Sequence, residues 1–506
     1  MNKNKIKAFL ATLIATGTLG MNISTVDAQE FQDVIPIEET IDSTSEEGNR
    51  LECSIILENE DGTSSEESVI ADSLNEAINI ARENGSTKVK IRLPRQFVID
   101  ESTDITGVDV EITGTEEGSE MYRAFDYSDG NDSLFIVKDN DESARPSSLK
   151  INNVVFYEES TNTQCSTVKN EGTEDVRVEF QNIGANYLGF SNCNTTVTDS
   201  LISGNINLSQ NDTFKGQNSY FKMLCFNEAK SVELDDCEIG IMSGEAKRAL
   251  IQNSVFDNNG VIYRGDKVLF DNCVFLNNLG ANHIKFIGFK NCKFNKDLKI
   301  NGCGNAQVSN TLLNNLNHEC GYQITEDSEE PGLNNDEDED SEKTVNKSIG
   351  RIGINNCKVT GYMKFKNSNA RICYTNIPIL NATNSKITTD FCGLGNVDLN
   401  SSDVTFRKGN IGGRYIQMGG NTSFDGVSVR SFILYPYGNN VFSNCKFSSG
   451  TRADNLKEDM DFYNGLCDRS FIVSYDSKTG TAQVKPARKE TSQGNNVKDS
   501  AWELQL

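Results

Sequence analysis

Four polar side chains in the second half of the chain have the chemistry and the local pattern to bind an acidic polysaccharide. They are Lys285 in His-Ile-Lys-Phe, Lys299 in Leu-Lys-Ile, Gln323 in Tyr-Gln-Ile and Lys364 in Met-Lys-Phe. Each stands between two apolar residues, so in a β-strand it would point away from a core that holds its neighbours. A column of such side chains, separated by one strand each, would hold successive carboxylates or sulfates.

A histidine accompanies this set. His283 stands two residues before Lys285 and would serve there as a proton carrier. The pattern also has a simpler interpretation, a solvated face on which the Lys stems cover apolar surface. The sequence leaves both interpretations open.

An acidic run near the middle of the chain suggests calcium chemistry. Asp336, Asp338 and Asp340 alternate as in a helix–loop–helix calcium site. That pattern also needs Gly and Glu where this chain has Ser341 and Lys347. The sequence therefore favours a solvated acidic loop and predicts no metal site and no cofactor, with Ca²⁺ as an unsupported alternative. A further interpretation is that the loop folds against the Lys column and shields it, a contact that salt would weaken.

Placing these side chains in one column requires strands stacked at a fixed spacing, and a 19-residue repeat supplies it. Asn recurs at Asn253, Asn272, Asn291 and Asn310, with an apolar residue two positions before and three after each. The residues three positions after are Phe256, Phe275, Phe294 and Leu313. A period of this length is about one turn of a parallel β-solenoid. Asn tolerates the left-handed conformation of a tight corner, and stacked amides can bond to one another.

We therefore predict an all-β fold: a single right-handed parallel β-helix, built as a three-sheet solenoid, with a short N-terminal capping helix. Apolar residues on both sides of each corner would point inward and close a narrow core. This register is well specified, because a slip of one residue would reverse which side chains face the core.

The chain has 14 cysteines, and their positions argue for an internal row rather than a disulfide framework. Six directly follow a corner Asn or Asp: Cys193, Cys237, Cys273, Cys292, Cys357 and Cys445. Other coils place Val154, Ser254 or Thr311 there. Such a slot suits small, weakly polar side chains facing the interior, where a free Cys behaves as a small hydrophobe. A disulfide between adjacent coils, about 5 Å apart, stays open as the alternative.

The net charge of −25 is concentrated in two stretches. Residues 30–68 carry −12 and residues 326–342 carry −10, so the repeat region is close to neutral. Nucleic acid and anionic membranes are therefore not expected as bulk partners. The first residues combine Lys3, Lys5 and Lys7 with an apolar run and a small-residue cleavage site at Ala28, which predicts a signal peptide and an extracellular protein. No other segment approaches the ~20 apolar residues that a membrane span needs.

The same features predict the organisation of the chain. It comprises a signal peptide at 1–28, an acidic linker at 29–68 with room for one strand at 53–57, an N-terminal cap at 69–114, a β-helix at 115–450 with an acidic turn insertion at 325–347, and a C-terminal cap or tail at 451–506. In the N-terminal cap, Ser73 and Glu76 form a capping box before a helix that Asn84-Gly85 ends.

That helix, which reads Ser-Leu-Asn-Glu-Ala-Ile-Asn-Ile-Ala, precedes an Ile-Arg-Leu-Pro strand and a coil repeat. The order resembles the N-terminal cap of the pectate-lyase-like β-helix superfamily. The resemblance covers roughly Val69 to Gly450 as architecture. It departs at Arg95, where such proteins commonly have Gly.

The resemblance implies polysaccharide chemistry, but the catalytic motifs of that superfamily do not carry over. Its polygalacturonases use Asn-Thr-Asp, Asp-Asp, Gly-His-Gly and Arg-x-Lys. Here neither His283 nor His318 has a Gly neighbour, Arg-x-Lys is absent, and Asp235-Asp236 stands where other coils have the corner Asn. The lyase pattern of a Trp with a following Asp-His is also absent, since Trp502 is the only Trp.

Two classes of function follow from these observations. The first is a secreted, non-enzymatic cell-surface or extracellular protein that binds an acidic polysaccharide or a host surface glycan in adhesion. The alternative is a polysaccharide lyase or glycoside hydrolase that acts on an acidic polysaccharide through the Lys column and His283.

Overall fold

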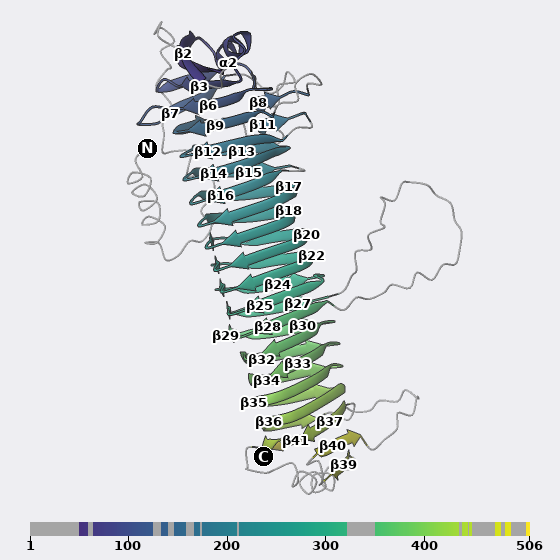
Figure 1. Cartoon of the computed structure of the whole chain (residues 1–506). Helices are drawn as coiled ribbons and strands as arrows, with labels where there is room; N and C mark the ends of the chain where they lie inside the picture. The colour runs from purple at the N-terminus through teal and green to yellow at the C-terminus, as the bar shows by residue number, and fades with distance from the viewer. Residues whose placement is uncertain are drawn as a thin grey trace, which may run out of the picture. The chain divides into compact units, whose positions relative to one another are not determined.

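The computed structural model describes residues 50–58, 64–124, 133–139, 146–157, 166–172, 175–209, 212–320, 350–434, 438–443, 445–447, 471–476, 481–486 and 502–505. This part of the chain is nearly all β and forms a parallel β-solenoid of about 16 turns, as the sequence predicts. The chain divides into two compact units, Met1–Met223 and Leu224–Leu506. Figure 1 labels the elements.

Unit 1 consists of short strands and one described helix. Its elements are β1 (Leu51–Glu58), β2 (Ser64–Ala71), α2 (Leu74–Glu83), β3 (Lys88–Arg92), β4 (Gln96–Ile99), β5 (Thr103–Asp104), β6 (Asp109–Thr113), β7 (Ser119–Arg123), β8 (Ser133–Val137), β9 (Ser148–Asn152), β10 (Val154–Tyr157), β11 (Ser166–Asn170), β12 (Val176–Gln181), β13 (Gly184–Ser191), β14 (Cys193–Thr198), β15 (Leu201–Leu208) and β16 (Thr213–Gln217). β17 (Tyr220–Asp235) contains the boundary between the units.

Helix α2 begins and ends where the capping signals place it. The Ser73 hydroxyl accepts a hydrogen bond from the Glu76 N–H at 3.1 Å. The Glu76 carboxylate accepts from the Asp72 N–H at 2.7 Å, one residue earlier than in an ideal capping box. The helix buries one apolar face, made of Leu74, Ala77, Ile78 and Ala81. It ends at Glu83 with Asn84 as its C-cap, because Gly85 adopts φ +69° and turns the chain away.

The segment predicted as a linker contains more structure than one strand. β1 pairs antiparallel with β2 and also with β3, and β3 pairs parallel with β6 in the first coil. The described strands β1 and β2 therefore lie on the edge of the first coil, mostly within the stretch predicted as a linker. The second partner of β1 is β3, roughly 30–40 residues further along the chain, and local composition does not reveal this pairing.

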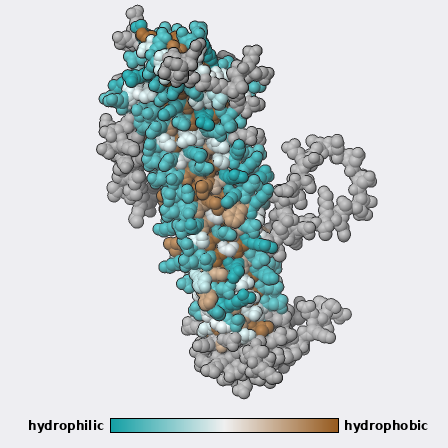
Figure 2. Space-filling view, in the orientation of Figure 1, coloured by the Kyte–Doolittle hydropathy of each residue, from teal (hydrophilic) through white to brown (hydrophobic). Residues whose placement is uncertain are grey.

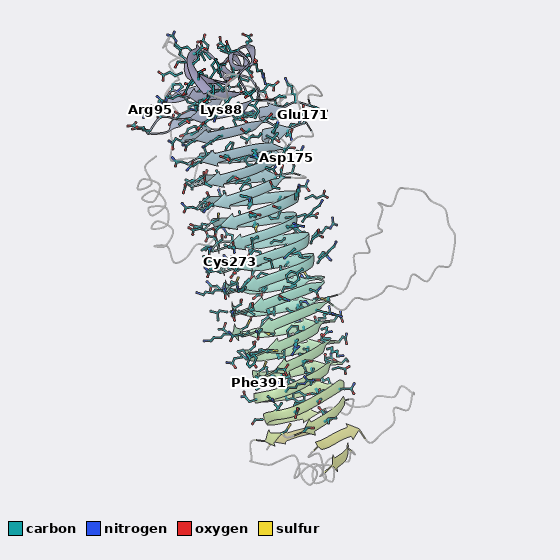
Figure 3. The ribbon with its side chains drawn as sticks, in the orientation of Figure 1. Lys88, Arg95, Glu171, Asp175, Cys273 and Phe391 are labelled. Atoms are coloured by element: carbon teal, nitrogen blue, oxygen red, sulfur yellow. The ribbon has the colours of Figure 1, made fainter. Side chains whose placement is uncertain are left out.

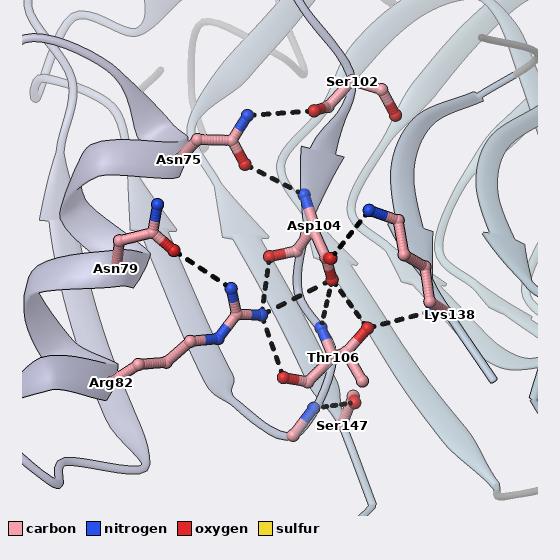
Figure 4. A network of polar contacts seen from close by, with 9 residues as sticks. Asn75, Asn79, Arg82, Ser102, Asp104, Thr106, Lys138 and Ser147 are labelled. Atoms are coloured by element: carbon pink, nitrogen blue, oxygen red, sulfur yellow. Dashed lines mark hydrogen bonds and ion pairs between the residues drawn. The ribbon is translucent and has the colours of Figure 1, made fainter. Parts of the chain in front are cut away.

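A polar network joins α2 to the coil beneath it (Figure 4). Arg82 donates to the carbonyls of Asp104 and Thr106 at 3.1 and 3.0 Å. The Asp104 carboxylate accepts from the Thr106 hydroxyl at 2.6 Å and lies 3.1 Å from the Lys138 ammonium. Burial alone would raise the pKa of Asp104, but the hydrogen bonds from Thr106 and the Lys138 charge outweigh it and lower that pKa below its usual range.

Unit 2 repeats three strand positions per coil. Its elements are β18 (Glu238–Gln252), β19 (Val255–Phe256), β20 (Gly260–Asp271), β21 (Val274–Phe275), β22 (Leu279–Lys290), β23 (Lys293–Phe294), β24 (Asp297–Asn301), β25 (Asn305–Ser309), β26 (Leu312–Leu313), β27 (Asn315–Glu319), β28 (Arg351–Asn355), β29 (Lys358–Val359), β30 (Tyr362–Lys366), β31 (Asn369–Cys373), β32 (Asn376–Thr383), β33 (Lys386–Asp390), β34 (Gly393–Asn400), β35 (Asp403–Met418), β36 (Gly420–Leu434), β37 (Gly438–Ser443), β38 (Lys446–Phe447), β39 (Phe471–Asp476), β40 (Thr481–Pro486) and β41 (Trp502–Gln505).

The corner residues of unit 2 stack as the repeat predicts. Asn253, Asn272, Asn291 and Asn310 all adopt left-handed backbone conformations, with φ between 51° and 56°. The side-chain amide of Asn272 donates a hydrogen bond to the side-chain oxygen of Asn253 at 2.8 Å. In a later coil, the side-chain amide of Asn356 donates in the same way to the side-chain oxygen of Asn310 at 2.9 Å. Amide hydrogen bonds between coils thus offset the cost of the corner conformation.

The slot after each corner is an interior position, and its cysteines are free thiols in the described residues. Their Sγ atoms donate to the carbonyl two residues earlier, as in Cys237 to Asp235 at 3.3 Å. Ser254 makes the same bond at 2.6 Å, which explains why Cys, Ser and Thr alternate there. Burial raises the pKa of the Cys303 and Cys392 thiols to about 11, so they stay protonated at neutral pH. Cys165 and Cys467 lie outside the described residues.

The core of unit 2 is a stack of phenylalanine rings. Phe275 lies face to face between Phe256 and Phe294, with ring centroids 4.7 and 4.4 Å away. Phe270 and Phe289 form a parallel stack at 5.1 Å, and Phe270 meets Phe275 edge-on. All five rings are almost fully buried. The inward direction predicted for these positions is confirmed.

At the C-terminal end, antiparallel strands replace the parallel repeat. β40 pairs antiparallel with β37 and β39, and β41 pairs antiparallel with β36. These strands occupy hydrogen-bonding edges that would otherwise stay open to another chain. No helix in the described part of the chain is long and apolar enough to cross a membrane.

Candidate functional site

Two of the predicted lysines share one column on the outer side of a sheet. The strands β24, β27 and β30 pair in parallel, with Lys299 opposite Asn317 and Asn317 opposite Lys364. Both lysines are exposed and Asn317 is half-buried. Neighbouring strands lie about 4.8 Å apart, so the two lysines stand roughly 10 Å apart along the column.

The prediction that Lys285 belongs to this column is wrong. The residue opposite Lys299 on the previous coil is Gly280, 19 positions earlier, whereas Lys285 is only 14 positions earlier. Between Gly280 and Lys285 the chain turns at His283, which has φ +56°. Lys285 therefore lies beyond the corner, where its ammonium is 3.1 Å from the Asp266 carboxylate.

The other two predicted residues do not join the column either. His283 is an exposed corner residue packed over Gly302, where an added Cβ would lie 2.7 Å from its Nδ1. Gln323 and the acidic insertion at 325–347 lie outside the described residues, as does the shielding contact suggested for that insertion. Within the described residues, no group of three or more acidic, His or Cys side chains is arranged to hold a metal ion.

Hydrogen bonds fix the polar side chains around the two lysines. The Asn317 amide donates to the Tyr362 hydroxyl at 3.3 Å, and the Tyr362 N–H donates to the Asn315 side chain at 3.0 Å. At the edge, Lys366 forms an ion pair with Glu319. We call Lys299, Asn317, Tyr362 and Lys364 the lysine face. Among the described residues no carboxylate is within ion-pair distance of Lys299 or Lys364, so both charges are available to a ligand.

Sequence reasoning missed Asn317 and Tyr362. Asn317 stands between apolar Leu316 and buried His318, so it has the same outward pattern as Lys299. Tyr362 opens its strand and is half-buried. The apolar–polar alternation around Asn317 could have identified it as an outward residue. The hydrogen bond from its amide to the Tyr362 hydroxyl could not be predicted in this way, because the two residues are 45 positions apart in the chain.

A second group of charged residues lines a cavity of about 430 Å³ in unit 1. Lys88, Asp109, Ser148 and Arg177 form one outward column of this sheet, and Lys90, Glu111, Lys150 and Glu179 form the next. All of these except Lys90 line the cavity, together with Pro146, Ser147, Val110 and Leu149. Figure 3 labels Lys88 among the strands of unit 1.

The charges in this cavity largely neutralise one another. Lys150 lies 4.0 Å from Glu111, and the Ser148 hydroxyl donates to Asp109 at 2.6 Å. The sequence could not show this cavity, because the coils of unit 1 have unequal lengths. Asp109 and Ser148 are paired on neighbouring strands and are 39 positions apart in the chain. Ser148 and Arg177 are paired in the same way but are only 29 positions apart.

The molecular surface in view is mostly hydrophilic, with apolar side chains in small groups (Figure 2). The chain matches no protein-family model, no curated protein and no solved structure, so its likeness to the pectate-lyase-like superfamily is one of parallel β-solenoid architecture.

Proposed function

We propose that this is an exported β-solenoid protein whose lysine face binds an anionic polysaccharide without cleaving it. The observation that carries the proposal is the column Lys299–Asn317–Lys364, in which an amide and two ammonium groups project from consecutive strands, with no ion-pair partner for either ammonium among the described residues. Export is supported by the charge and apolar pattern of residues 1–28.

A rigid sheet suits this task because its strands hold the ammonium groups at a fixed spacing before the ligand arrives. Anionic groups about 10 Å apart on a polymer would meet both lysines, since two strand spacings separate them. Beside the two lysines, Asn317 supplies an amide, and Tyr362 supplies a hydroxyl and the edge of an aromatic ring. Exposed ion pairs are each worth little, so binding should be weak per contact, sensitive to salt and cumulative along the polymer.

The test compares two double variants that remove the same charge. Lys299→Ala with Lys364→Ala should weaken binding to polygalacturonate or heparin by about tenfold at low salt, because two contacts of ~0.5–1 kcal/mol each are lost. Lys293→Ala with Lys358→Ala removes two exposed lysines from β23 and β29, outside the lysine face, and should change the affinity less than twofold. Affinity is measured by titration calorimetry at several salt concentrations. Equal losses in both variants would show that only the overall charge matters.

The cavity in unit 1 favours a second candidate function, a glycoside hydrolase or lyase. Glu111 and Glu179 lie on the strands on either side of the strand that holds Lys150. Two strand spacings separate their backbone positions, which are therefore about 10 Å apart. Inverting glycosidases use two carboxyl groups roughly 6.5–9.5 Å apart, one as acid and one as base. Lys88, Lys150 and Arg177 would hold an anionic sugar beside them.

This second function predicts turnover. Incubation with uronate polymers should release new reducing ends or unsaturated products, and Glu111→Gln with Glu179→Gln should reduce that release at least 100-fold by removing both proton-transfer groups. Glu116→Gln, an exposed residue of the same unit, serves as the control. Absence of any product over the whole panel excludes the hydrolytic function and leaves binding.

A further inference from the structure

Two aromatic residues occupy corner positions at which earlier coils of unit 2 have Asn. Tyr374 and Phe391 follow Asn356 in the same ladder and share its left-handed conformation, with φ of 50° and 55°. Lys408 takes the next position, with φ of 45°. The backbone N–H groups of Tyr374 and Phe391 donate to the following coil at 3.0 Å, as the Asn corners do. The corner is therefore built normally, and only its side chains differ.

The three side chains form one continuous surface. The Tyr374 and Phe391 rings stack with centroids 5.1 Å apart and an angle of 6° between their planes. The Lys408 ammonium lies 5.1 Å from the centroid of Phe391. Tyr374 is 60% exposed and Phe391 is 49% exposed. Figure 3 shows Phe391 at the side of the stacked strands.

Aromatic residues are not the most favourable choice for this corner. A bulky residue in the left-handed region costs roughly 1–2 kcal/mol, whereas Asn adopts it readily and can add an amide hydrogen bond. Ring stacking and the cation–π contact each stabilise the folded state by roughly 0.5–1.5 kcal/mol, but about half of each aromatic side chain remains exposed to water. Strain of this kind in an exposed position is typical of binding sites, where the surface is shaped for a partner.

Polar groups adjoin the rings on the preceding sheet. Cys373, Asp390 and Arg407 immediately precede the three corner residues and form a column of their own. The Asp390 carboxylate lies 3.7 Å from the guanidinium of Arg371. Because the two rings stack face to face and Lys408 lies over Phe391, the rings present their edges to solvent. These apolar edges, bordered by a carboxylate, guanidinium groups and an ammonium, combine the groups that contact a sugar, which carries both apolar C–H groups and hydroxyls. The positive charge of Arg407 and Lys408 complements an acidic sugar.

We propose that Tyr374, Phe391 and Lys408 form a binding platform for one hexuronate ring of an acidic polysaccharide. The sugar lies along the side of the stack, where its C–H groups pack against the exposed edges of both rings and its carboxylate meets Lys408. This site is separate from the lysine face, and it rests on the proposed function only for the class of ligand.

The test replaces both aromatic residues by the residue that the other corners use. Tyr374→Asn with Phe391→Asn should fold, with a thermal midpoint equal to or above that of the wild type, because Asn relieves the corner strain. Its affinity for polygalacturonate should fall about tenfold. Tyr374→Phe keeps both rings and should retain the wild-type affinity. In the wild type, saturation of aromatic protons should transfer to sugar C–H protons in an NMR saturation-transfer experiment.

The outcomes separate this platform from the lysine face. Loss of affinity in the corner variant with no loss in Lys299→Ala/Lys364→Ala supports the platform and contradicts the lysine face, and the reverse pattern contradicts the platform. Absence of aromatic-to-sugar saturation transfer in the wild type overturns the platform whether or not the variant folds. If the wild type self-associates in sedimentation and the corner variant does not, the occupant is a second copy of the chain and the sugar proposal is wrong.

Discussion

Replacing Phe275 by Ala should lower the free energy of unfolding by about 3–5 kcal/mol, the usual cost of removing a fully buried aromatic ring. Phe275 is 1% exposed and is stacked between Phe256 and Phe294. The ring thus connects three consecutive coils, and its loss leaves a cavity that neither neighbour can fill. The effect should appear as a lower denaturant midpoint and faster amide hydrogen exchange in β20 to β23.

Leu276 supplies the matched control for this prediction. It follows Phe275 directly but is 39% exposed. Leu276→Ala should cost about 1 kcal/mol or less, because its side chain already contacts water. Comparable losses in both variants would contradict the view that the ring stack stabilises this part of the solenoid.

The second large effect is a loss of stability in mild acid caused by His318. Its ring is 1% exposed and lies under the lysine face, on the inner side of β27. Burial lowers the pKa of His318 to about 4. Its Nδ1 is 2.8 Å from the Ser368 hydroxyl and its Nε2 is 3.7 Å from the Cys320 sulfur. A thiol is a poor acceptor for the second N–H of an imidazolium, so among the described residues burial dominates and disfavours the charged form.

The direction of the pH effect follows from these values. An unfolded His has a pKa of about 6.5, so above this pH both states are neutral and the full stability is present. As the pH falls from about 6.5 to 4, the unfolded state binds a proton that the folded state does not, and stability falls by about 1.4 kcal/mol per unit. The total loss should reach about 2–3 kcal/mol near pH 4.

The variant His318→Phe isolates this contribution. Phenylalanine fits beside Phe365, and Ser368 retains a carbonyl acceptor in Lys366 at 2.9 Å. The unfolding free energy of the wild type minus that of the variant should fall by about 2–3 kcal/mol between pH 6.5 and pH 4, because only the wild type loses the His318 contribution. A difference that stays constant over this range would mean that the pKa of His318 is the same in the folded and the unfolded state, and would contradict this prediction.

The repeat between Asn253 and Asn310 determined the coil length, the corner residues and the inward direction of Phe256 and Phe275. A solenoid makes this prediction dependable, because each coil contacts only its neighbours and a constant period makes residues 19 apart direct neighbours in space. The capping box at Ser73 and the row of free thiols were predictable for the same local reasons.

The tertiary structure alone decided features that cross a corner or join coils of unequal length. Lys285 appeared to align with Lys299, but the turn at His283 placed them on different faces. The pairing of β1 with β3 and the cavity around Lys150 bring together residues whose distances along the chain follow no constant period. The Tyr374 and Phe391 corners are 17 positions apart rather than 19, so the repeat did not identify them.

The sequence by itself thus determined a β-solenoid with Asn corners, a phenylalanine core and an outward Lys299 and Lys364. Only the tertiary structure decided which outward residues share a face, how Asn317 and Tyr362 join them, and where two rings stack in the open. The physical reason is that inward positions are imposed by burial, which leaves a periodic trace in the chain. Neighbourhood on the outer surface depends on the length of every turn, and the sequence does not record that length.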